Sequence, residues 1–303
     1  MSDLKKTYFK FIRSQETSGE QFKDKLRQLK NFYLPICDKL FKLYKSKNRT
    51  LLIGLSGSQG SGKSTISQIL KIIFHSNFNL NVVSFSIDDF YKTSSERKKM
   101  SKSIHPLFMT RGVPGTHDHK IISNFFTKVK SKNFKSIKLP KFDKSTDDRC
   151  KSKLWYKVKF KPDVVILEGW CVGAKAQNSS KMKKPINSLE KIKDPNLIWR
   201  KYVNTQLKTN YKKLFKHLDE IIYLKSSSFK LLQVWRIKQE KSLWMNSKKK
   251  KNLKIMKKSD VINFMQTYQR ITQNMFKDAP KYASIIFKLD SKHQVNSAIY
   301  KKK

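Results

Sequence analysis

The residues best suited to chemistry form a glycine-rich loop between an apolar run and a helical pattern. They fit the spacing G-x-x-x-x-G-K-S and are Gly57, Ser58, Gln59, Gly60, Ser61, Gly62, Lys63 and Ser64. Glycines let the backbone curl until successive N–H groups face phosphate oxygens, and the dipole of the following helix attracts the anion. We expect Lys63 to reach the β- and γ-phosphates and the Ser64 hydroxyl to contact Mg²⁺, while Thr65 completes the nucleotide site. The loop therefore predicts that a nucleoside triphosphate binds here.

This loop alone does not distinguish an ATPase, a GTPase and a kinase. The sequence contains no N-K-x-D signature of guanine recognition, which disfavours a GTPase. The positions of further carboxylates and substrate-binding groups must decide between the remaining reactions.

Acidic residues follow two apolar runs that are typical of buried strands. Asp88 comes directly after the run Val82–Ile87, and Glu168 comes directly after the run Val164–Leu167. In parallel sheets the carboxyl ends of strands hold ligands, so Asp88 is suited to accept the proton of an attacking hydroxyl and to help hold Mg²⁺. Glu168 is suited to the same cation. The alternatives are a turn or helix cap for Asp88 and a solvated strand end for Glu168.

A second polar loop, from Arg111 to Asp118, lies between these two acids in the sequence and reads RGVPGTHD. Arg111 is suited to clamp a carboxylate through two N–H groups and His117 to bond a hydroxyl, while Asp118 is also suited to cap the following helix. The segment Lys141–Ser145 offers another basic patch, with ordinary surface charge as the alternative. These residues predict a site for a small acceptor molecule.

The elements that must position these residues alternate between strands and helices. This order predicts an α/β fold of the P-loop type, with three layers and a mainly parallel five-stranded sheet. The expected strands are Leu51–Leu55, Val82–Ile87, Val164–Leu167, Ile221–Leu224 and Ser284–Leu289. Residues 1–48 have apolar positions at helical spacing and predict an N-terminal helical extension to a catalytic domain at 49–303.

Three lysine-rich stretches lack clear periodicity. We expect Ser94–Met109 and Lys175–Asp194 to be mobile insertions or surface loops, and Lys248–Lys258 to resemble them. Insertions or a lid are expected at about 175–194 and 228–260.

The net charge of +45 is the most unusual total for a chain of 303 residues. Most of the 67 basic residues are lysines spread along the chain, whereas nucleic-acid recognition usually recruits arginine, so we predict no specific nucleic-acid partner. No apolar stretch is long enough for a membrane helix, and three cysteines without a CxxC pair suggest a cytoplasmic protein. The sequence does not indicate an oligomeric state.

With these residues in view, the chain resembles the D-glycerate 3-kinase family, within the P-loop group that includes uridine kinase, pantothenate kinase and phosphoribulokinase. The resemblance covers roughly residues 48–278. The blocks that carry it are GLSGSQGSGKST (54–65), SIDDFYKT (86–93), RGVPGTHD (111–118), KFDKS (141–145), LEGW (167–170) and VWRIKQE (234–240). The second, third and fourth blocks are the most particular to glycerate kinases.

The resemblance implies ATP-dependent phosphorylation of D-glycerate to 3-phosphoglycerate with Mg²⁺. It implies that Asp88 is the base, that Lys63 and Ser64 serve the nucleotide and metal, that Glu168 lies in the metal shell and that Arg236 belongs to a lid. The expected acceptor-binding residues are Asp88, Tyr91, Arg111, His117, Asp118 and Lys141.

Some features depart from the family pattern. Trp244 stands where relatives tend to carry a basic lid residue, the stretch Lys248–Lys258 is expanded, and the N-terminal helices have no counterpart that carries over. Two alternatives stay open: a uridine- or pantothenate-kinase-like enzyme with another substrate, and a P-loop ATPase associated with nucleic acid.

Overall fold

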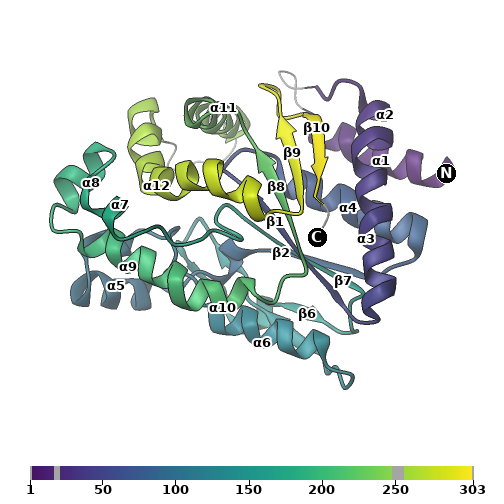
Figure 1. Ribbon diagram of the computed structural model, residues 1–303, viewed down its shortest axis with the longest axis horizontal. Helices are drawn as coiled ribbons and strands as arrows, with labels where there is room; N and C mark the ends of the chain where they lie inside the picture. The colour runs from purple at the N-terminus through teal and green to yellow at the C-terminus, as the bar shows by residue number, and fades with distance from the viewer. Residues whose placement is uncertain (1, 17–20, 248–255, 302–303) are drawn as a thin grey trace.

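Apolar runs in the sequence form the centre of one large sheet (Figure 1). The computed structural model describes residues 2–16, 21–247 and 256–301. The sheet order is β10-β9-β8-β1-β7-β2, in which all neighbours are parallel except β9 and β10. Its strands are β1 Leu51–Gly57, β2 Val82–Ser86, β7 Val164–Gly169, β8 Glu220–Lys225, β9 Ile285–Leu289 and β10 Val295–Tyr300. The predicted mainly parallel α/β fold is confirmed, with six strands in this sheet where five were expected.

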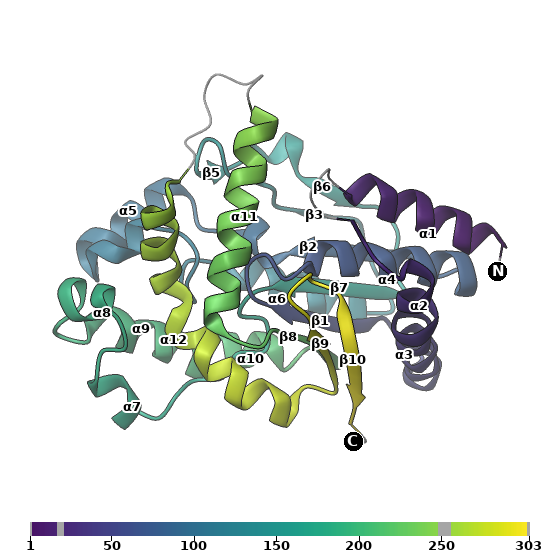
Figure 2. The same ribbon diagram turned by 90° about the horizontal axis from the view of Figure 1, so that it is seen from above.

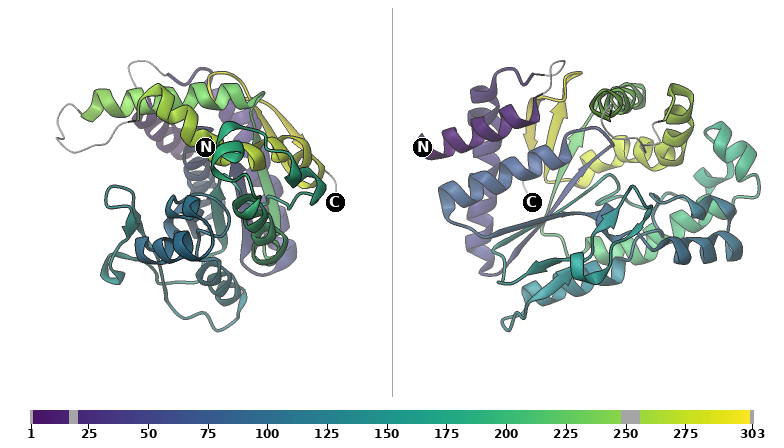
Figure 3. Two further views of the ribbon diagram at one scale, coloured as in Figure 1. Left: turned by 90° about the vertical axis from the view of Figure 1, so that its left-hand side faces the viewer. Right: turned by 180° about the vertical axis from the view of Figure 1, so that it is seen from behind.

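The central strands β1 and β7 are buried along their whole length because both faces of the sheet are covered there. Ile53 and Ile166 belong to one hydrophobic cluster, whereas Leu52 and Leu167 belong to the other. Helices α1, α4 and α11 contribute to the first cluster, and α6, α9 and α10 to the second. Figure 3 shows these two groups on opposite sides of the sheet. The sheet is therefore the middle of three layers.

Helices connect the strands in the predicted alternating order. Those longer than four residues are α1 Ser2–Gln15, α3 Leu34–Lys47, α4 Lys63–Phe78, α5 Ser94–Ser103, α6 His119–Lys130, α8 Ser188–Lys193, α9 Ile198–Gln206, α11 Phe229–Ser247 and α12 Lys258–Tyr282. Single helical turns are α2 Lys25–Gln28, α7 Ser180–Lys183 and α10 Lys212–Phe215; 3-10 turns lie at Ile87–Phe90, Pro106–Met109 and Ser152–Leu154, and π-helical turns at Leu29–Tyr33 and Leu207–Tyr211. Two small antiparallel pairs join β3 Ile137–Leu139 to β6 Tyr156–Val158 and β4 Phe142–Asp143 to β5 Asp148–Arg149.

The N-terminal helices pack onto the sheet and share its core. Tyr8 of α1 and Ile36 of α3 are buried in the same cluster as Ile53. The buried Gln28 side chain donates to the Val295 carbonyl at 2.8 Å and accepts from the Val295 N–H at 3.2 Å. The helical segment is thus joined to β10 at the opposite end of the chain.

The strand β10 was not expected from the sequence. It is an antiparallel edge strand, reached through a tight turn in which His293 has φ +63°. Its residues Val295–Tyr300 are mostly half-buried or exposed and include polar side chains, so they lack the continuous apolar run that marked the other strands.

Two stretches predicted as mobile insertions or surface loops contain ordered helices. Ser94–Met109 forms α5 and a 3-10 turn, and the Arg97 side chain in it is fully buried. The stretch 175–194 contains α7 and α8, with Glu190 and Asp194 buried in ion pairs to Arg270 and Arg200. The prediction was wrong because hydrogen-bonded ion pairs, rather than an apolar stripe, hold these segments in place. In the third stretch, residues 248–255 lie outside the described residues.

Helices α11 and α12 lie side by side (Figure 2). Among the residues in the described ranges, no helix combines the length and apolar character needed to cross a membrane.

Candidate active site

The loop from Gly57 to Gly62 turns the chain sharply between β1 and α4. Gly60 and Gly62 have φ of +74° and +80°, which L-residues with a side chain rarely adopt. A Cβ at Gly57 would lie 2.6 Å from the Ser61 hydroxyl, so this position has no room for one. The loop ends at the N-terminus of the 16-residue helix α4, where the helix dipole attracts anions.

Lys63 and Ser64 begin α4 and face the end of β7. The Lys63 ammonium donates to the Ser58 carbonyl at 2.9 Å, and the Ser64 hydroxyl donates to Glu168 Oε1 at 2.8 Å. Burial lowers the pKa of Lys63, an effect opposed by the carboxylates of Glu168 and Asp88. The lysine therefore lies within electrostatic reach of both acids that the sequence predicted.

Glu168 is suited to hold a cation. Its side chain is buried, and its Oε2 atom has no hydrogen-bond partner among the described residues. Burial raises the pKa of Glu168, although Lys63 and the Ser64 hydrogen bond oppose the shift. A carboxylate oxygen without a partner beside a serine hydroxyl fits Mg²⁺, which usually takes one or two carboxylates and completes its shell with water and phosphate oxygens. No group of three or more His, Cys, Asp or Glu side chains placed to hold a metal occurs in the part of the chain that the structure describes.

Asp88 is the second residue of the 3-10 turn Ile87–Phe90, which follows β2 directly. Its Oδ1 atom accepts a hydrogen bond from the Tyr91 hydroxyl at 2.8 Å, and its Oδ2 atom lies 3.3 Å from the Lys144 ammonium. Burial acts to raise the pKa of Asp88, but Lys144, His117, Tyr91 and Lys63 together hold it below its ordinary value. Asp88 is therefore ionised at neutral pH.

Lys144 was not singled out from the sequence. It lies within the KFDKS block, whose first lysine, Lys141, was the predicted contact. Lys141 is exposed, and its backbone carbonyl accepts from the Cys150 N–H at 2.8 Å in the β4–β5 hairpin. The hairpin thus directs Lys144, and not Lys141, toward Asp88.

Arg111 lies in the loop that the sequence assigned to an acceptor molecule. Its guanidinium forms an ion pair with Asp147 and lies 5.3 Å from the centre of the Phe142 ring. Asp147, which has φ +54° in the turn of the β4–β5 hairpin, also binds the buried Arg97. Sequence reasoning missed Asp147 because nothing in a lone loop aspartate reveals two arginine partners.

His117 is buried behind Asp88. Its Nδ1 atom lies 2.6 Å from the Tyr211 hydroxyl, and its ring stacks on Tyr91 with centres 4.6 Å apart. Burial lowers the pKa of His117 to about 4, although Asp88 opposes the shift. The ring is therefore neutral at physiological pH, and it supports Tyr91, which in turn bonds Asp88.

Asp118 caps α6, accepting from the Ile121 N–H at 3.4 Å, and lies 3.6 Å from Arg149. This is the capping role that the sequence offered beside substrate contact. Among the described residues, its side chain makes no hydrogen bond or ion pair with Asp88 or Lys63.

Arg236 lies on α11, which packs directly on the phosphate-binding loop. A Cβ at Gly60 would lie 3.3 Å from Trp235 Cβ and 3.9 Å from the Arg236 backbone nitrogen. The Arg236 guanidinium forms an ion pair with Glu240, one turn further along α11. The helix is thus next to the nucleotide site while the guanidinium is held by Glu240. The Trp244 side chain lies outside the described residues.

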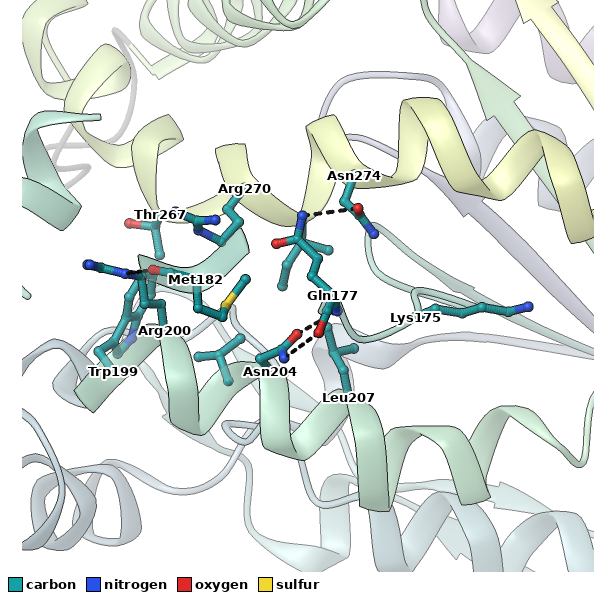
Figure 4. A pocket seen from close by; sticks show the side chains of 12 residues that line it. Lys175, Gln177, Met182, Trp199, Arg200, Asn204, Leu207, Thr267, Arg270 and Asn274 are labelled. Atoms are coloured by element: carbon teal, nitrogen blue, oxygen red, sulfur yellow. Dashed lines mark hydrogen bonds between the residues drawn. The ribbon is translucent and has the colours of Figure 1, made fainter. Parts of the chain in front are cut away.

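A small cavity with a different set of lining residues lies between α9 and α12 (Figure 4). It is lined by residues of α9 and α12 and by the segment that contains Lys175 and Gln177. The Gln177 side-chain amide donates a hydrogen bond to Asn274 Oδ1 at 3.0 Å. Its volume of about 20 Å³ has room for roughly one water molecule. None of its lining residues was predicted to belong to the active site. The contacts of Lys63 with Ser58, and its proximity to Asp88 and Glu168, place the candidate active site at the sheet edge instead.

Comparisons with known proteins agree with this geometry. A model of the phosphoribulokinase/uridine kinase family matches residues 52–182. The chain is 30% identical over 273 residues to the uncharacterized kinase mug58 of Schizosaccharomyces pombe, which covers 86% of this chain and 91% of that protein. It is 27% identical over 231 residues to the chloroplastic D-glycerate 3-kinase of Arabidopsis thaliana, covering 70% of this chain and 48% of that protein.

A solved structure of D-glycerate 3-kinase from Cryptococcus neoformans shares the fold. It aligns with a TM-score of 0.68 at 24% identity and covers 83% of this chain and 90% of that chain. The resemblance seen in the motifs is therefore confirmed by relatives that match most of the chain. The chain belongs to the phosphoribulokinase/uridine kinase family of P-loop kinases, within its D-glycerate 3-kinase-like group.

Proposed function

We propose that this kinase transfers the γ-phosphoryl group of ATP to a small hydroxy acid, with D-glycerate as the best candidate and 3-phosphoglycerate as the product. The observation that carries the proposal is the ionised carboxylate of Asp88, held between Tyr91 and Lys144 and within electrostatic reach of Lys63. The name of the Arabidopsis relative and the motif blocks that resemble those of glycerate kinases support glycerate.

The residues divide into a phosphate side and an acceptor side. Lys63 and the N–H groups of the glycine-rich loop bind the β- and γ-phosphate oxygens. Arg111 binds the acceptor carboxylate, because its guanidinium has five N–H donors and the pair with Asp147 leaves several of them free.

Asp88 acts as the general base. It takes the proton of the acceptor hydroxyl while the hydroxyl oxygen forms a bond to the γ-phosphorus and the bond to the leaving ADP oxygen breaks. Ser64, Glu168 and Asp88 are the residues that would hold Mg²⁺. When bound, Mg²⁺ supplies positive charge to the phosphate oxygens.

A coupled assay of ADP formation tests the proposal with D-glycerate, uridine and pantothenate as acceptors, followed by ³¹P NMR of the product. We expect turnover with D-glycerate and the resonance of 3-phosphoglycerate. Protein that binds ATP yet turns over none of the three would refute a small-molecule kinase of this type. ATP hydrolysis stimulated by polynucleotide, and weakened steeply by salt, would instead favour the nucleic-acid-associated ATPase that the +45 charge leaves open.

Asp88→Asn tests the base directly. The change keeps the size of the side chain but removes the proton acceptor, so we expect kcat to fall by about 10²- to 10⁴-fold while ATP affinity stays unchanged. Asp278→Asn, at a surface residue of α12 that pairs with Lys281, is the matched control and should keep full activity. Undiminished turnover in Asp88→Asn would remove Asp88 from this role.

A further inference from the structure

Tyr268 of α12 lies near both Arg111, in the predicted acceptor loop, and Arg236, in the predicted lid. Its ring is buried and meets Trp170 edge-on, with ring centres 4.9 Å apart. On its other side the ring packs against Phe264 at 5.0 Å, and the guanidinium of Arg236 lies 5.9 Å from the centre of the Phe264 ring. Phe264 thus links the tyrosine to Arg236 on α11.

The Tyr268 hydroxyl also reaches the acceptor loop. A Cβ at Gly112 would lie only 2.3 Å from the Tyr268 oxygen, and Gly112 has φ +136°. The Gly112 carbonyl accepts from the Trp170 indole N–H at 3.0 Å, which fixes the loop at this point. Because Gly112 follows Arg111 in the chain, the hydroxyl lies beside the predicted carboxylate clamp.

Tyr268 as a whole is only 4% exposed, and its hydroxyl makes no hydrogen bond to any residue within 2–16, 21–247 or 256–301. Its oxygen is nevertheless not among the polar atoms that the protein encloses completely, so it is open to a molecule bound beside the Arg111 loop. Burial and the charge of Asp88 raise the pKa of Tyr268, while Arg111 and Arg236 oppose them. The phenol therefore stays protonated and is available as a donor.

We propose that the Tyr268 hydroxyl donates a hydrogen bond to an anionic oxygen bound between Arg111 and Arg236. The inference rests on the proposed kinase reaction, in which two groups supply such an oxygen: the carboxylate of the acceptor and the phosphoryl group in transfer. Neither the motifs nor the family resemblance pointed to Tyr268.

Steady-state kinetics of Tyr268→Phe test the proposal, since this change removes the hydroxyl and keeps the ring packed against Trp170 and Phe264. Loss of a hydrogen bond to a charged group should lower kcat/KM by about 10- to 100-fold. A rise in the acceptor KM with an unchanged KM for ATP identifies the acceptor carboxylate. A fall in kcat with an unchanged acceptor KM identifies the phosphoryl group.

Tyr282→Phe is the matched control. Tyr282 lies on the same helix, and its hydroxyl likewise has no hydrogen-bond partner among the described residues. Unlike that of Tyr268, however, its oxygen is enclosed by protein, and its ring packs against Lys175. We expect wild-type kinetics from this variant, and the same Tm for both variants because neither loses a hydrogen bond within the protein. Wild-type constants in Tyr268→Phe, or equal losses in both variants, would overturn the proposal.

The activity of the wild-type protein distinguishes failure of the proposed function from failure of the Tyr268 proposal. If it phosphorylates no acceptor in the panel, calorimetric binding of D-glycerate and of ATP to the wild type and to Tyr268→Phe decides the matter. A loss of affinity of about fivefold or more for either ligand, confined to Tyr268→Phe, would support the contact. Equal affinities, or no binding of either ligand, would overturn it.

Discussion

Replacing Arg97 by methionine should both destabilise the protein and loosen the acceptor site. The Arg97 guanidinium is fully buried and donates to the carbonyls of Lys92 at 3.2 Å, Met109 at 2.8 Å and Asp147 at 2.5 Å, and to the Asp147 carboxylate at 3.0 Å. It thereby ties α5 and the following 3-10 turn to the hairpin that carries Lys144 and Asp147.

The magnitude follows from the groups left behind. Arg97→Met keeps most of the buried volume but leaves three backbone carbonyls without this donor, while the Asp147 carboxylate keeps Arg111. A polar group left without its partner costs about 1–3 kcal/mol, so we expect a total loss of about 3–5 kcal/mol. For 303 residues, an unfolding entropy of about 2.1 cal/mol/K per residue gives roughly 0.6 kcal/mol/K, so Tm should fall by about 5–8 °C.

Thermal unfolding and steady-state kinetics measure the two effects. We expect the acceptor KM to rise, because Asp147 holds both Arg97 and Arg111, while the KM for ATP stays close to that of the wild type. Arg27→Met is the control, since the Arg27 side chain is 52% exposed and lies 3.7 Å from Asp24, so its loss should change stability by less than about 0.5 kcal/mol. Equal Tm values for Arg97→Met and Arg27→Met would refute this reasoning.

Two further changes probe the charges of the site. Lys144→Ala removes the cation that most lowers the pKa of Asp88. Because the base must be ionised, the acidic limb of kcat/KM should move to higher pH, and a limb that stays in place would contradict the assignment. Glu168→Gln keeps the hydrogen bond from Ser64 but removes the charge. In a magnesium titration, the concentration of free Mg²⁺ that gives half-maximal rate should therefore rise by about tenfold. An unchanged magnesium requirement would exclude Glu168 from the metal site.

The parts of the fold that could be predicted are those in which local sequence and burial agree. The central strands are apolar on both faces, so Leu51–Leu55 and Val164–Leu167 stood out, and the carboxyl ends of these strands placed Lys63 and Glu168 at one edge of the sheet. The glycine-rich loop could be predicted because the spacing of its glycines matches the positions where the backbone needs a positive φ, as at Gly60 and Gly62.

The remaining parts depend on tertiary contacts that leave no local pattern. The helix α5 is polar on most of its surface, and its place is set by Arg97 bonding to residues up to 50 positions away. Lys144, Asp147 and Tyr268 are ordinary surface or helical residues in the sequence, and only the fold brings them next to Asp88 and Arg111.

The double hydrogen bond between Gln28 and Val295 has a consequence for self-association. An outer strand of a sheet presents unpaired backbone groups that a second molecule can extend, which is a common start of aggregation. Here a side-chain amide from the N-terminal helices occupies both the donor and the acceptor of Val295, in the way a neighbouring strand would. A Gln28→Ala variant, which keeps the N-terminal helices packed on the sheet but frees both backbone groups of Val295, would therefore be expected to self-associate through β10 more readily than the wild type.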